Sequence, residues 1–460
     1  MRKGAAVTIL LLNLILLPVA SAFTQALPAA KSLFKGNPFS DAAAGSDSGP
    51  VLTLEDAVAL ALKQASNYKT AQINELISAE DIAQARAAFY PVIAAKPNVI
   101  YTTPSFSIPA GTTQRPASFL GANAISEFQG LVTAAGEIDT SGKLKAALKR
   151  NEFLLAAAKA GSLVARRELI QAVVDAYFTL ALATTKRRGA ENNLQTASDF
   201  ENNIKLQLDA GEVAPVDLVR ARLQAAARRD ELAQTQADES INAAALKFLI
   251  GYEFTTPVAT IELLSLLPTD GELDQYTETA IHTRPEYAQF EAQLRAAEQD
   301  VKFARAERRP QINYGVRTGF ISDSLRPNRV KNSTGAEVTF GVNIPLFDRG
   351  ASKSRETQAR LRIQQTENAK QLAERTFLQA FYTARTQAMF AANRIKQIRL
   401  SIADAELNVS ASLARYRSGE ASIIEVTDAQ NTLVTQRQSL YQAIFDYQTA
   451  RAHLLHAIGQ

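Results

Sequence analysis

The chain carries the same sequence pattern twice, and this duplication restricts its fold more than any other feature. The segment Gly-Glu-Val-Ala-Pro-Val-Asp that begins at Gly211 recurs at Gly419 as Gly-Glu-Ala-Ser-Ile-Ile-Glu. Internal similarity at a fixed offset indicates that one structural unit has been repeated along the chain. We therefore assign the first structural repeat to residues 52–251, a linker to 252–272 and the second structural repeat to 273–460.

Two strands are predicted in each repeat because apolar and polar residues alternate there, which is the pattern of a half-buried strand. In the second repeat the alternation covers about 311–321 and 335–347, with a polar loop between them. In the first repeat it covers about 92–103 and 119–138, where it is less regular and the assignment rests partly on the repeat. Each predicted strand has one apolar face and one polar face.

A very long helix is predicted after each strand pair, at about 141–208 and 351–416, because neither segment contains a proline. At 1.5 Å per residue these helices are about 100 Å long. Each is followed by a turn and a return helix, and the second repeat begins with a further helix over 273–309. Because a two-helix hairpin leaves both flanks uncovered, we expect further helices from other copies of the chain to pack beside it.

The first residues have the pattern of a secretory signal peptide. Residues 1–3 are cationic, residues 5–20 are mostly apolar, and residues 20–22 are small, as at a cleavage site. We expect residues 1–22 to be removed and residues 23–51 to form an extended leader, with a retained membrane anchor as the alternative. The rest of the sequence has no apolar stretch of about 18 residues, so any further membrane span is expected to be a β-barrel.

The composition excludes several classes of function. The chain has no cysteine, no tryptophan and three histidines, so disulfides, thiolate metal sites and cysteine nucleophiles are ruled out. The net charge of +4 does not favour a nucleic-acid-binding protein. His453 and His456 lie three residues apart but lack nearby carboxylates at ligand spacing, which favours an ordinary role near a helix end over a metal site. No cofactor motif and no catalytic constellation is found.

Two segments carry a resemblance to a known family. Residues 345–350 read Pro-Leu-Phe-Asp-Arg-Gly, and Tyr-Arg-Ser-Gly at 416–419 is followed by Ser-Ile-Ile-Glu-Val-Thr-Asp-Ala-Gln at 422–430. With these motifs, the mature chain resembles the outer-membrane efflux protein family, the TolC-like channels. The resemblance implies a mainly α-helical protein with membrane β-structure: a homotrimer whose twelve-stranded β-barrel in the outer membrane continues as a periplasmic α-helical barrel.

The resemblance also implies a function and a set of partners. The protein would be the passive exit duct of a tripartite efflux or type I secretion system, without enzymatic activity. It would contact outer-membrane lipid, a periplasmic adaptor (membrane fusion) protein and an inner-membrane pump, and the adaptor and pump would open its periplasmic tip.

Four residues match the family's periplasmic entrance. Glu425 and Asp428 match an acidic constriction, and Asp217 and Tyr416 match a hydrogen-bonded latch that closes it. The alternative reading of each carboxylate is a solvated helix N-terminus, where acidic residues are favoured. The family's latch commonly includes an arginine at the position that Ala421 occupies here, so this chain departs from the pattern. The turns that would dock the adaptor consist of Gly211, Glu212, Val213, Ala214, Gly419, Glu420, Ala421 and Ser422.

Other interpretations of the sequence belong to different classes of protein. A periplasmic adaptor also has a signal peptide and a long helical hairpin, but it would contain one hairpin between β-domains rather than two tandem repeats. A soluble coiled-coil scaffold of the cell envelope is disfavoured by the amphipathic strands. An envelope hydrolase is disfavoured by the scarcity of catalytic residue types.

Overall fold

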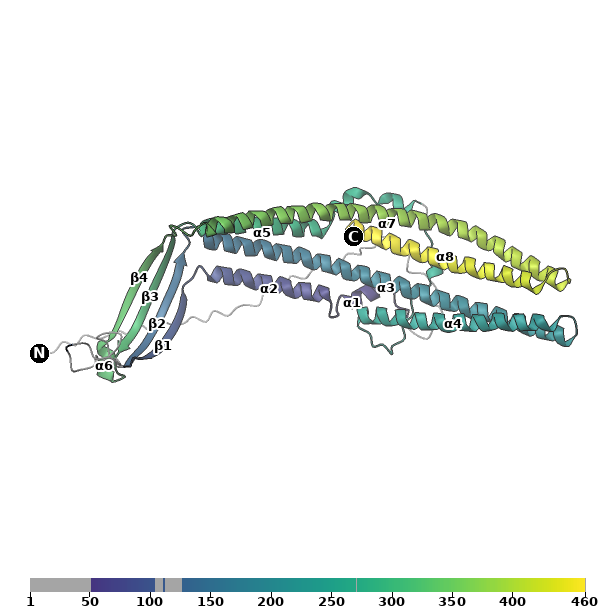
Figure 1. The fold of residues 1–460 in the computed structure, drawn as a ribbon, viewed down its shortest axis with the longest axis horizontal. Coiled ribbons are helices and arrows are strands. Elements are labelled where there is room, and N and C mark those ends of the chain that lie inside the picture. The colour runs from purple at the N-terminus through teal and green to yellow at the C-terminus, as the bar shows by residue number, and fades with distance from the viewer. Residues whose placement is uncertain (1–50, 104–110, 112–125, 270, 460) are drawn as a thin grey trace. The chain divides into compact units, whose positions relative to one another are not determined.

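Along the chain, a pair of strands, a long helix and a return helix follow one another in that order twice (Figure 1). The computed structural model describes residues 51–103, 111, 126–269 and 271–459. The predicted signal peptide, the leader up to residue 50 and residues 119–125 of the predicted second strand lie outside the described residues.

The first series of elements comprises α1 (Leu54–Ala61), α2 (Asn67–Ala87), β1 (Val92–Tyr101), β2 (Ser126–Ile138), α3 (Lys143–Asp209) and α4 (Pro215–Ile250). The second comprises α5 (Pro285–Ala306), β3 (Gln311–Ser322), α6 (Pro327–Asn332), β4 (Thr334–Asn343), α7 (Ala351–Arg417) and α8 (Ile423–Ala457). Between the two series lie the 3-10 helices η1 (Leu263–Ser265), η2 (Glu272–Gln275) and η3 (Glu278–Thr283).

The four strands form one antiparallel sheet in the order β1-β2-β3-β4. Its register places Val316 opposite both Ala134 and Val338, and Ala134 opposite Ile93. Residues opposite each other in a sheet share a face, so most of the large apolar residues of the four strands lie on one side of the sheet. On the other side Arg317 Nε donates to Glu337 Oε2 at 2.6 Å. The predicted division into an apolar and a polar face is therefore present in the sheet.

Proline sets two boundaries that differ from the predicted ones. Strand β4 ends at Asn343 rather than at 347, because Pro345 has no N–H to donate to a neighbouring strand. Helix α5 begins at Pro285 rather than at Leu273: the backbone of Arg284 is extended, as is usual before proline, and η2 and η3 occupy most of the preceding segment. The first series starts with two helices, α1 and α2, where the second starts with the single helix α5.

The two long helices contain 67 residues each and begin in similar ways. Before α3, the Asp139 carboxylate accepts hydrogen bonds from two backbone N–H groups of the first turn, at 3.2 and 2.9 Å. Before α7, Asp348 accepts the backbone N–H of Ser352 at 2.8 Å. Hydrogen bonds from the Ser352 hydroxyl and from the N–H groups of Ser352 and Gly350 hold the pKa of Asp348 below its usual range. These carboxylates satisfy N–H groups that a helix start leaves without partners.

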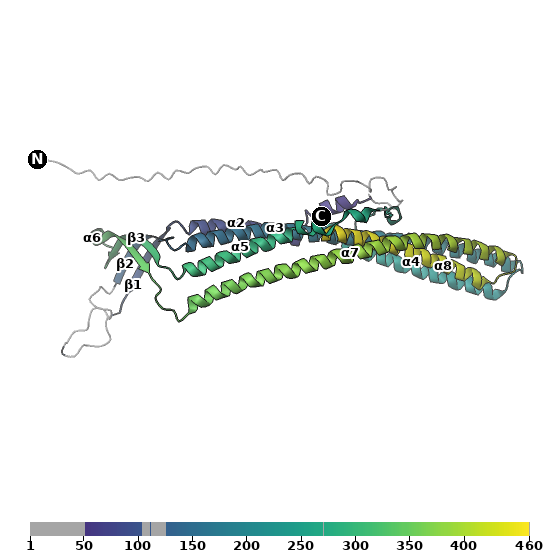
Figure 2. The same ribbon diagram turned by 90° about the horizontal axis from the view of Figure 1, so that it is seen from above.

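Each long helix packs against its return helix, which is about half as long: α4 has 36 residues and α8 has 35, against 67 in α3 and in α7 (Figure 2). Helix α3 contacts α4, α2 and α5, and α7 contacts α8 and α5. Gly189 lies within α3 where a Cβ atom would be 3.1 Å from the Tyr441 ring of α8, so the small residue permits close approach of these helices. The buried Tyr177 hydroxyl donates to Leu52 O at 2.9 Å and accepts the Ile261 N–H at 3.1 Å, which ties α3 to two connecting segments.

Candidate functional site: the two helical turns and their acidic residues

The two predicted turns have the same backbone geometry. Gly211 and Gly419 both adopt a left-handed conformation with φ of 77°. The Glu212 N–H donates to Gln207 O at 2.9 Å, and the Glu420 N–H donates to Arg415 O at 2.9 Å. These bonds define the Schellman motif, in which a glycine ends one helix and lets the chain reverse. The sequence repeat thus corresponds to one turn built twice.

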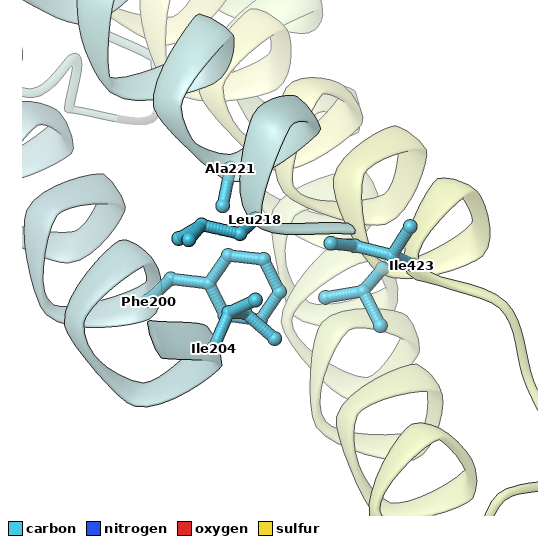
Figure 3. Packing of buried hydrophobic residues seen from close by; sticks show 6 residues of the cluster. Phe200, Ile204, Leu218, Ala221 and Ile423 are labelled. Atoms are coloured by element: carbon cyan, nitrogen blue, oxygen red, sulfur yellow. The ribbon is translucent and has the colours of Figure 1, made fainter. Parts of the chain in front are cut away.

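A hydrophobic cluster joins the two turns (Figure 3). Phe200 and Ile204 of α3 and Leu218 of α4 pack together with Ile423 and Val426 of α8. Tyr416 packs against this cluster, and its ring centroid lies 6.3 Å from that of Phe200. The first and second hairpins are therefore held together at their turns by apolar contacts. Ile423 is buried in this cluster and is therefore not part of the exposed surface of the second turn.

The predicted latch residues are neighbours without a hydrogen bond between them. The hydroxyl of Tyr416 is buried and has no hydrogen-bond partner among the described residues. Burial, and then the negative charge of Asp217, raise the pKa of Tyr416. The Asp217 carboxylate instead lies 3.7 Å from the guanidinium of Arg220, one turn further along α4. The phenol can thus donate a hydrogen bond to a group that comes within reach.

The two acidic residues of α8 have different surroundings. Ser422 is the N-cap of α8, and its hydroxyl accepts the Glu425 N–H at 3.4 Å. The Glu425 carboxylate forms an ion pair with Arg415 Nη1 at 2.5 Å, across the turn. Asp428 is exposed, and its carboxylate makes no hydrogen bond or ion pair within the part of the chain that the structure describes. The pair in which Arg415 takes part was not predicted from the sequence.

Most of the predicted docking residues form the outer surface of the turns. The exposed ones are Gly211, Glu212, Ala214, Gly419, Glu420 and Ser422, whereas Val213 and Ala421 are half-buried. Six of the eight predicted docking residues are thus exposed at the two turns.

The two histidines near the end of α8 have separate environments. His453 Nε2 lies 3.1 Å from Asp175 Oδ1, and this hydrogen bond raises the pKa of His453. Burial, followed by the charges of Arg167 and Arg284, lowers the pKa of His456 to about 4. Over the described ranges of the chain, no group of three or more histidine or acidic side chains has the arrangement of a metal site.

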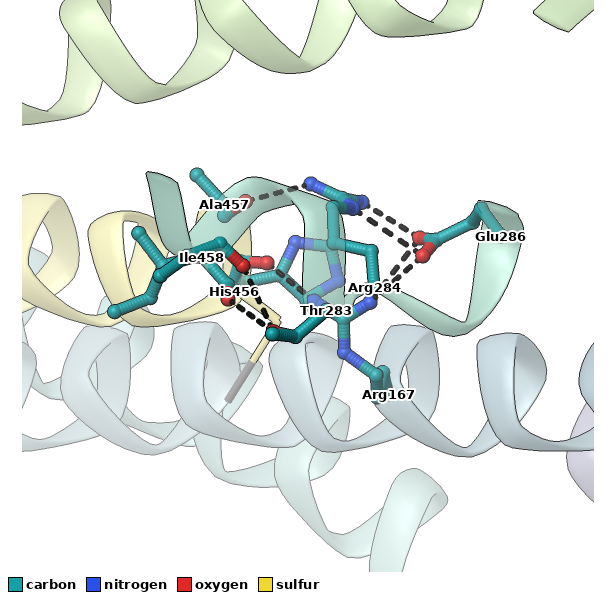
Figure 4. Close-up of polar contacts among 8 residues, drawn as sticks. Arg167, Thr283, Arg284, Glu286, His456, Ala457 and Ile458 are labelled. Atoms are coloured by element: carbon teal, nitrogen blue, oxygen red, sulfur yellow. Dashed lines mark hydrogen bonds and ion pairs between the residues drawn. The ribbon is translucent and has the colours of Figure 1, made fainter. Parts of the chain in front are cut away.

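A buried charged cluster surrounds the end of α8 (Figure 4). The Glu286 carboxylate accepts hydrogen bonds from Arg167 Nη1 at 3.0 Å and from Arg284 Nη2 at 2.6 Å. Arg284 also donates to Ala457 O at 3.0 Å, and Arg167 donates to His456 O. Burial opposes the charge of Glu286, but the hydrogen bonds from Arg284 and from the Glu286 backbone N–H, together with the charges of Arg284 and Arg167, hold its pKa below its usual range. The cluster satisfies the last carbonyls of α8 and joins that helix to α3 and α5.

Comparison with known proteins places this arrangement in a family. The family model described as "Outer membrane efflux protein" matches residues 57–252 and 277–460, which are nearly the two predicted repeats. The chain belongs to the outer membrane efflux protein family. The predicted family, its mainly helical fold with a small antiparallel sheet, and its outer-membrane location are thereby confirmed.

Individual relatives of this efflux protein are distant but cover most of the chain. Protein CyaE of Bordetella pertussis is 27% identical over 419 residues, which cover 89% of this chain and 84% of that protein. The cation efflux system protein CusC of Escherichia coli K12 is 25% identical over 340 residues, covering 72% and 73% of the two chains. The crystal structure of the Campylobacter jejuni CmeC outer membrane channel has a TM-score of 0.77 at 18% identity, with coverage of 88% and 85%. The fold of this chain is therefore similar to that of a known outer membrane channel.

As a family member the protein is a passive outer-membrane efflux channel and not an enzyme. Its partners are those of the family, an adaptor and an inner-membrane pump. Among the described helices, none is both long and apolar enough to cross a membrane.

Proposed function

We propose that three copies of this chain form the exit duct, with their sheets closed into one twelve-stranded barrel in the outer membrane. The observation that carries the proposal is the sheet itself. Strands β1 and β4 are its edges, and each has one side without a strand partner in the described chain. Exposed strand edges are costly in hydrocarbon, and symmetric copies remove them by pairing β1 of one protomer with β4 of the next.

The exposed apolar face supports a lipid contact for the same sheet. Phe340 and Val338 of β4 are 75% and 60% exposed, and Ile93 of β1 is 71% exposed. All three lie on the apolar face defined by the register. An apolar patch of this kind on a sheet indicates contact with lipid or protein, and an apolar outer face is typical of membrane barrel strands. The polar face, with Arg317 and Glu337, then lines the bore.

The long hairpins would continue that bore as a tube of helices in the periplasm. Their turns would dock the adaptor, and Glu425 and Asp428 would form rings of carboxylates at the narrow entrance by threefold symmetry. Such rings attract cations and resist anions. Tyr416 and Asp217 would close the entrance when the phenol donates to a carboxylate, a role supported by the hydroxyl that has no partner in the described part of the protomer.

Cross-linking tests the closure directly, because the chain has no cysteine of its own. A cysteine at Val338 of β4 is combined with single cysteines along β1, from Val92 to Tyr101, and the channel is oxidised in detergent. We expect at least one pair to link protomers into dimers and trimers on denaturing gels. Cysteines at Val316 and Val338, which are opposite each other within one sheet, serve as the control and should yield only cross-linked monomer.

Failure of every β1–β4 pair to link protomers, together with a monomeric mass in detergent, would contradict the trimer. Conductance in planar bilayers provides the second readout, because a sheet that does not close cannot form an aqueous pore.

A further inference from the structure

We propose that Arg415 sets the ion selectivity of the entrance by neutralising Glu425, so that the net negative charge there is the charge of one carboxylate per protomer. Asp428 is the carboxylate left without a counter-charge. This inference rests on the proposed function, since it assumes that these residues face the bore at the entrance. It assigns a role to a residue that has no place in the predicted ring or latch.

The position of Arg415 is fixed from two directions. Its carbonyl accepts the N–H groups of Glu420 and Ala421 at 2.9 and 3.2 Å, so its backbone is part of the turn. Its guanidinium reaches back across the same turn, where Nη1 contacts Glu425 at 2.5 Å and Nη2 contacts Glu420 O at 3.4 Å. The turn geometry therefore keeps the guanidinium of Arg415 within reach of the Glu425 carboxylate.

The first turn lacks this pair although its backbone is the same. Gln207 occupies the position of Arg415, and its carbonyl accepts the Glu212 N–H at 2.9 Å. Its side-chain Oε1 is buried and has no hydrogen-bond partner in the described chain. Asp217, the counterpart of Glu425, pairs at 3.7 Å with Arg220 on its own helix. Charge compensation across the turn is therefore a property of the second hairpin, where the predicted acidic ring lies.

The electrostatic consequence follows from the short distance within the pair. Opposite charges 2.5 Å apart are far closer than the Debye length of about 8 Å at physiological salt, so an ion in the bore senses a nearly neutral pair. Two carboxylates and one guanidinium leave one net negative charge per protomer. Removal of the Arg415 charge doubles it, and removal of the Glu425 charge abolishes it.

Four variants measured in planar bilayers test this charge balance through the cation-over-anion permeability ratio in a potassium chloride gradient. Arg415→Gln should raise the ratio about twofold or more, because the net charge of the ring doubles. Glu425→Gln and Asp428→Asn should each lower it. The double variant Arg415→Gln/Glu425→Gln should have the same permeability ratio as the unmodified channel, because it loses one positive and one negative charge. Each of the two single variants should differ from the unmodified channel.

Arg417→Gln is the matched control, because Arg417 is also exposed in the last turn of α7 and has no ion-pair partner among the described residues. Equal effects of Arg417→Gln and Arg415→Gln would mean that any nearby cation acts in the same way, which would overturn the assignment to Arg415. An unchanged ratio in Arg415→Gln, with a lowered ratio in Asp428→Asn, would also overturn it while leaving the acidic ring intact. If neither Asp428→Asn nor Glu425→Gln changes the ratio, the ring itself is wrong and the inference fails with it.

Discussion

The two helical turns share a backbone but are held by different side chains. Gly211 and Gly419 have the same φ of 77° and the same pattern of Schellman hydrogen bonds. The second turn adds the Ser422 cap and the Arg415–Glu425 pair, whereas the first has an Ala214–Pro215 start and an unpaired Gln207 oxygen. Glycine and the backbone bonds thus suffice to reverse the helix, and the side chains around the turn can differ in charge without changing its path.

The largest effect is expected from substitutions in the hydrophobic cluster that joins the two hairpins at their turns. Ile423→Ala and Leu218→Ala remove buried apolar atoms from opposite sides of the cluster. Each should lower the free energy of unfolding by about 2–5 kcal/mol, from lost burial and the cavity that remains. Thermal unfolding in detergent, followed by circular dichroism, measures the loss.

The neighbouring residue is the control for this experiment. Ile424 is 49% exposed, so Ile424→Ala should change the stability by no more than about 0.5 kcal/mol. Similar losses for Ile423→Ala and Ile424→Ala would show that the cluster does not hold the hairpins together.

The next prediction concerns the shared backbone. Gly211→Ala and Gly419→Ala force an L-residue into the left-handed region, which costs about 1–2 kcal/mol. No heavy atom lies within 4 Å of the Cβ that either substitution would add, so the cost is conformational and should be equal at the two turns. Unfolding midpoints of the two variants in urea check this. Unequal midpoints would mean that the two turns are not equivalent.

A smaller effect is expected from the helix caps, where the two turns differ. Ser422→Ala removes the side-chain acceptor for the Glu425 N–H and should cost about 1 kcal/mol. The reciprocal change, Ala214→Ser, offers an acceptor to the Asp217 N–H at a helix start that lacks a side-chain cap, and should stabilise the protein by a similar amount. Thermal midpoints of the two variants should shift in opposite directions. A shift of both thermal midpoints in the same direction would contradict the prediction that the two turns differ in their helix caps.

The smallest expected effect on stability comes from the Arg415–Glu425 pair. The side chains are 52% and 38% exposed, and exposed pairs contribute about 0–1 kcal/mol because water and salt screen them. Arg415→Gln should therefore leave the unfolding midpoint nearly unchanged, and any difference should vanish in about 1 M salt, where the Debye length is about 3 Å. A large loss that persists in salt would assign the residue a structural role beyond charge.

The elements that the sequence predicts well are those with local causes. The alternation in 311–321 arises from the two-residue period of a strand, and the 67-residue α7 arises from a segment without proline. The start of α5 also has a local signal in the sequence. Pro285 fixes the first turn of a helix and Arg284 before it is extended, so this step outweighs the helical pattern that predicts a start at Leu273.

Contacts between distant residues could not be predicted in the same way. Arg167 and Glu286 are 119 residues apart and meet only because α3 and α5 pack side by side. The Arg415–Glu425 pair spans ten residues, but it forms only because the turn directs both side chains to one side. A sequence supplies the charges for such pairs, whereas the packing and the turn decide which charges meet.

The buried cluster at the end of α8 fixes that end of the helix to its neighbours. Arg167 donates a hydrogen bond to the carbonyl of His456, and Arg284 donates one to the carbonyl of Ala457. The other end of the same 35-residue helix adjoins the second turn. At 1.5 Å per residue that helix is a lever about 52 Å long, so a tilt of about 10° at its pinned end moves the turn by about 9 Å. The position of the turn is therefore sensitive to small changes in the angle of α8 at this cluster.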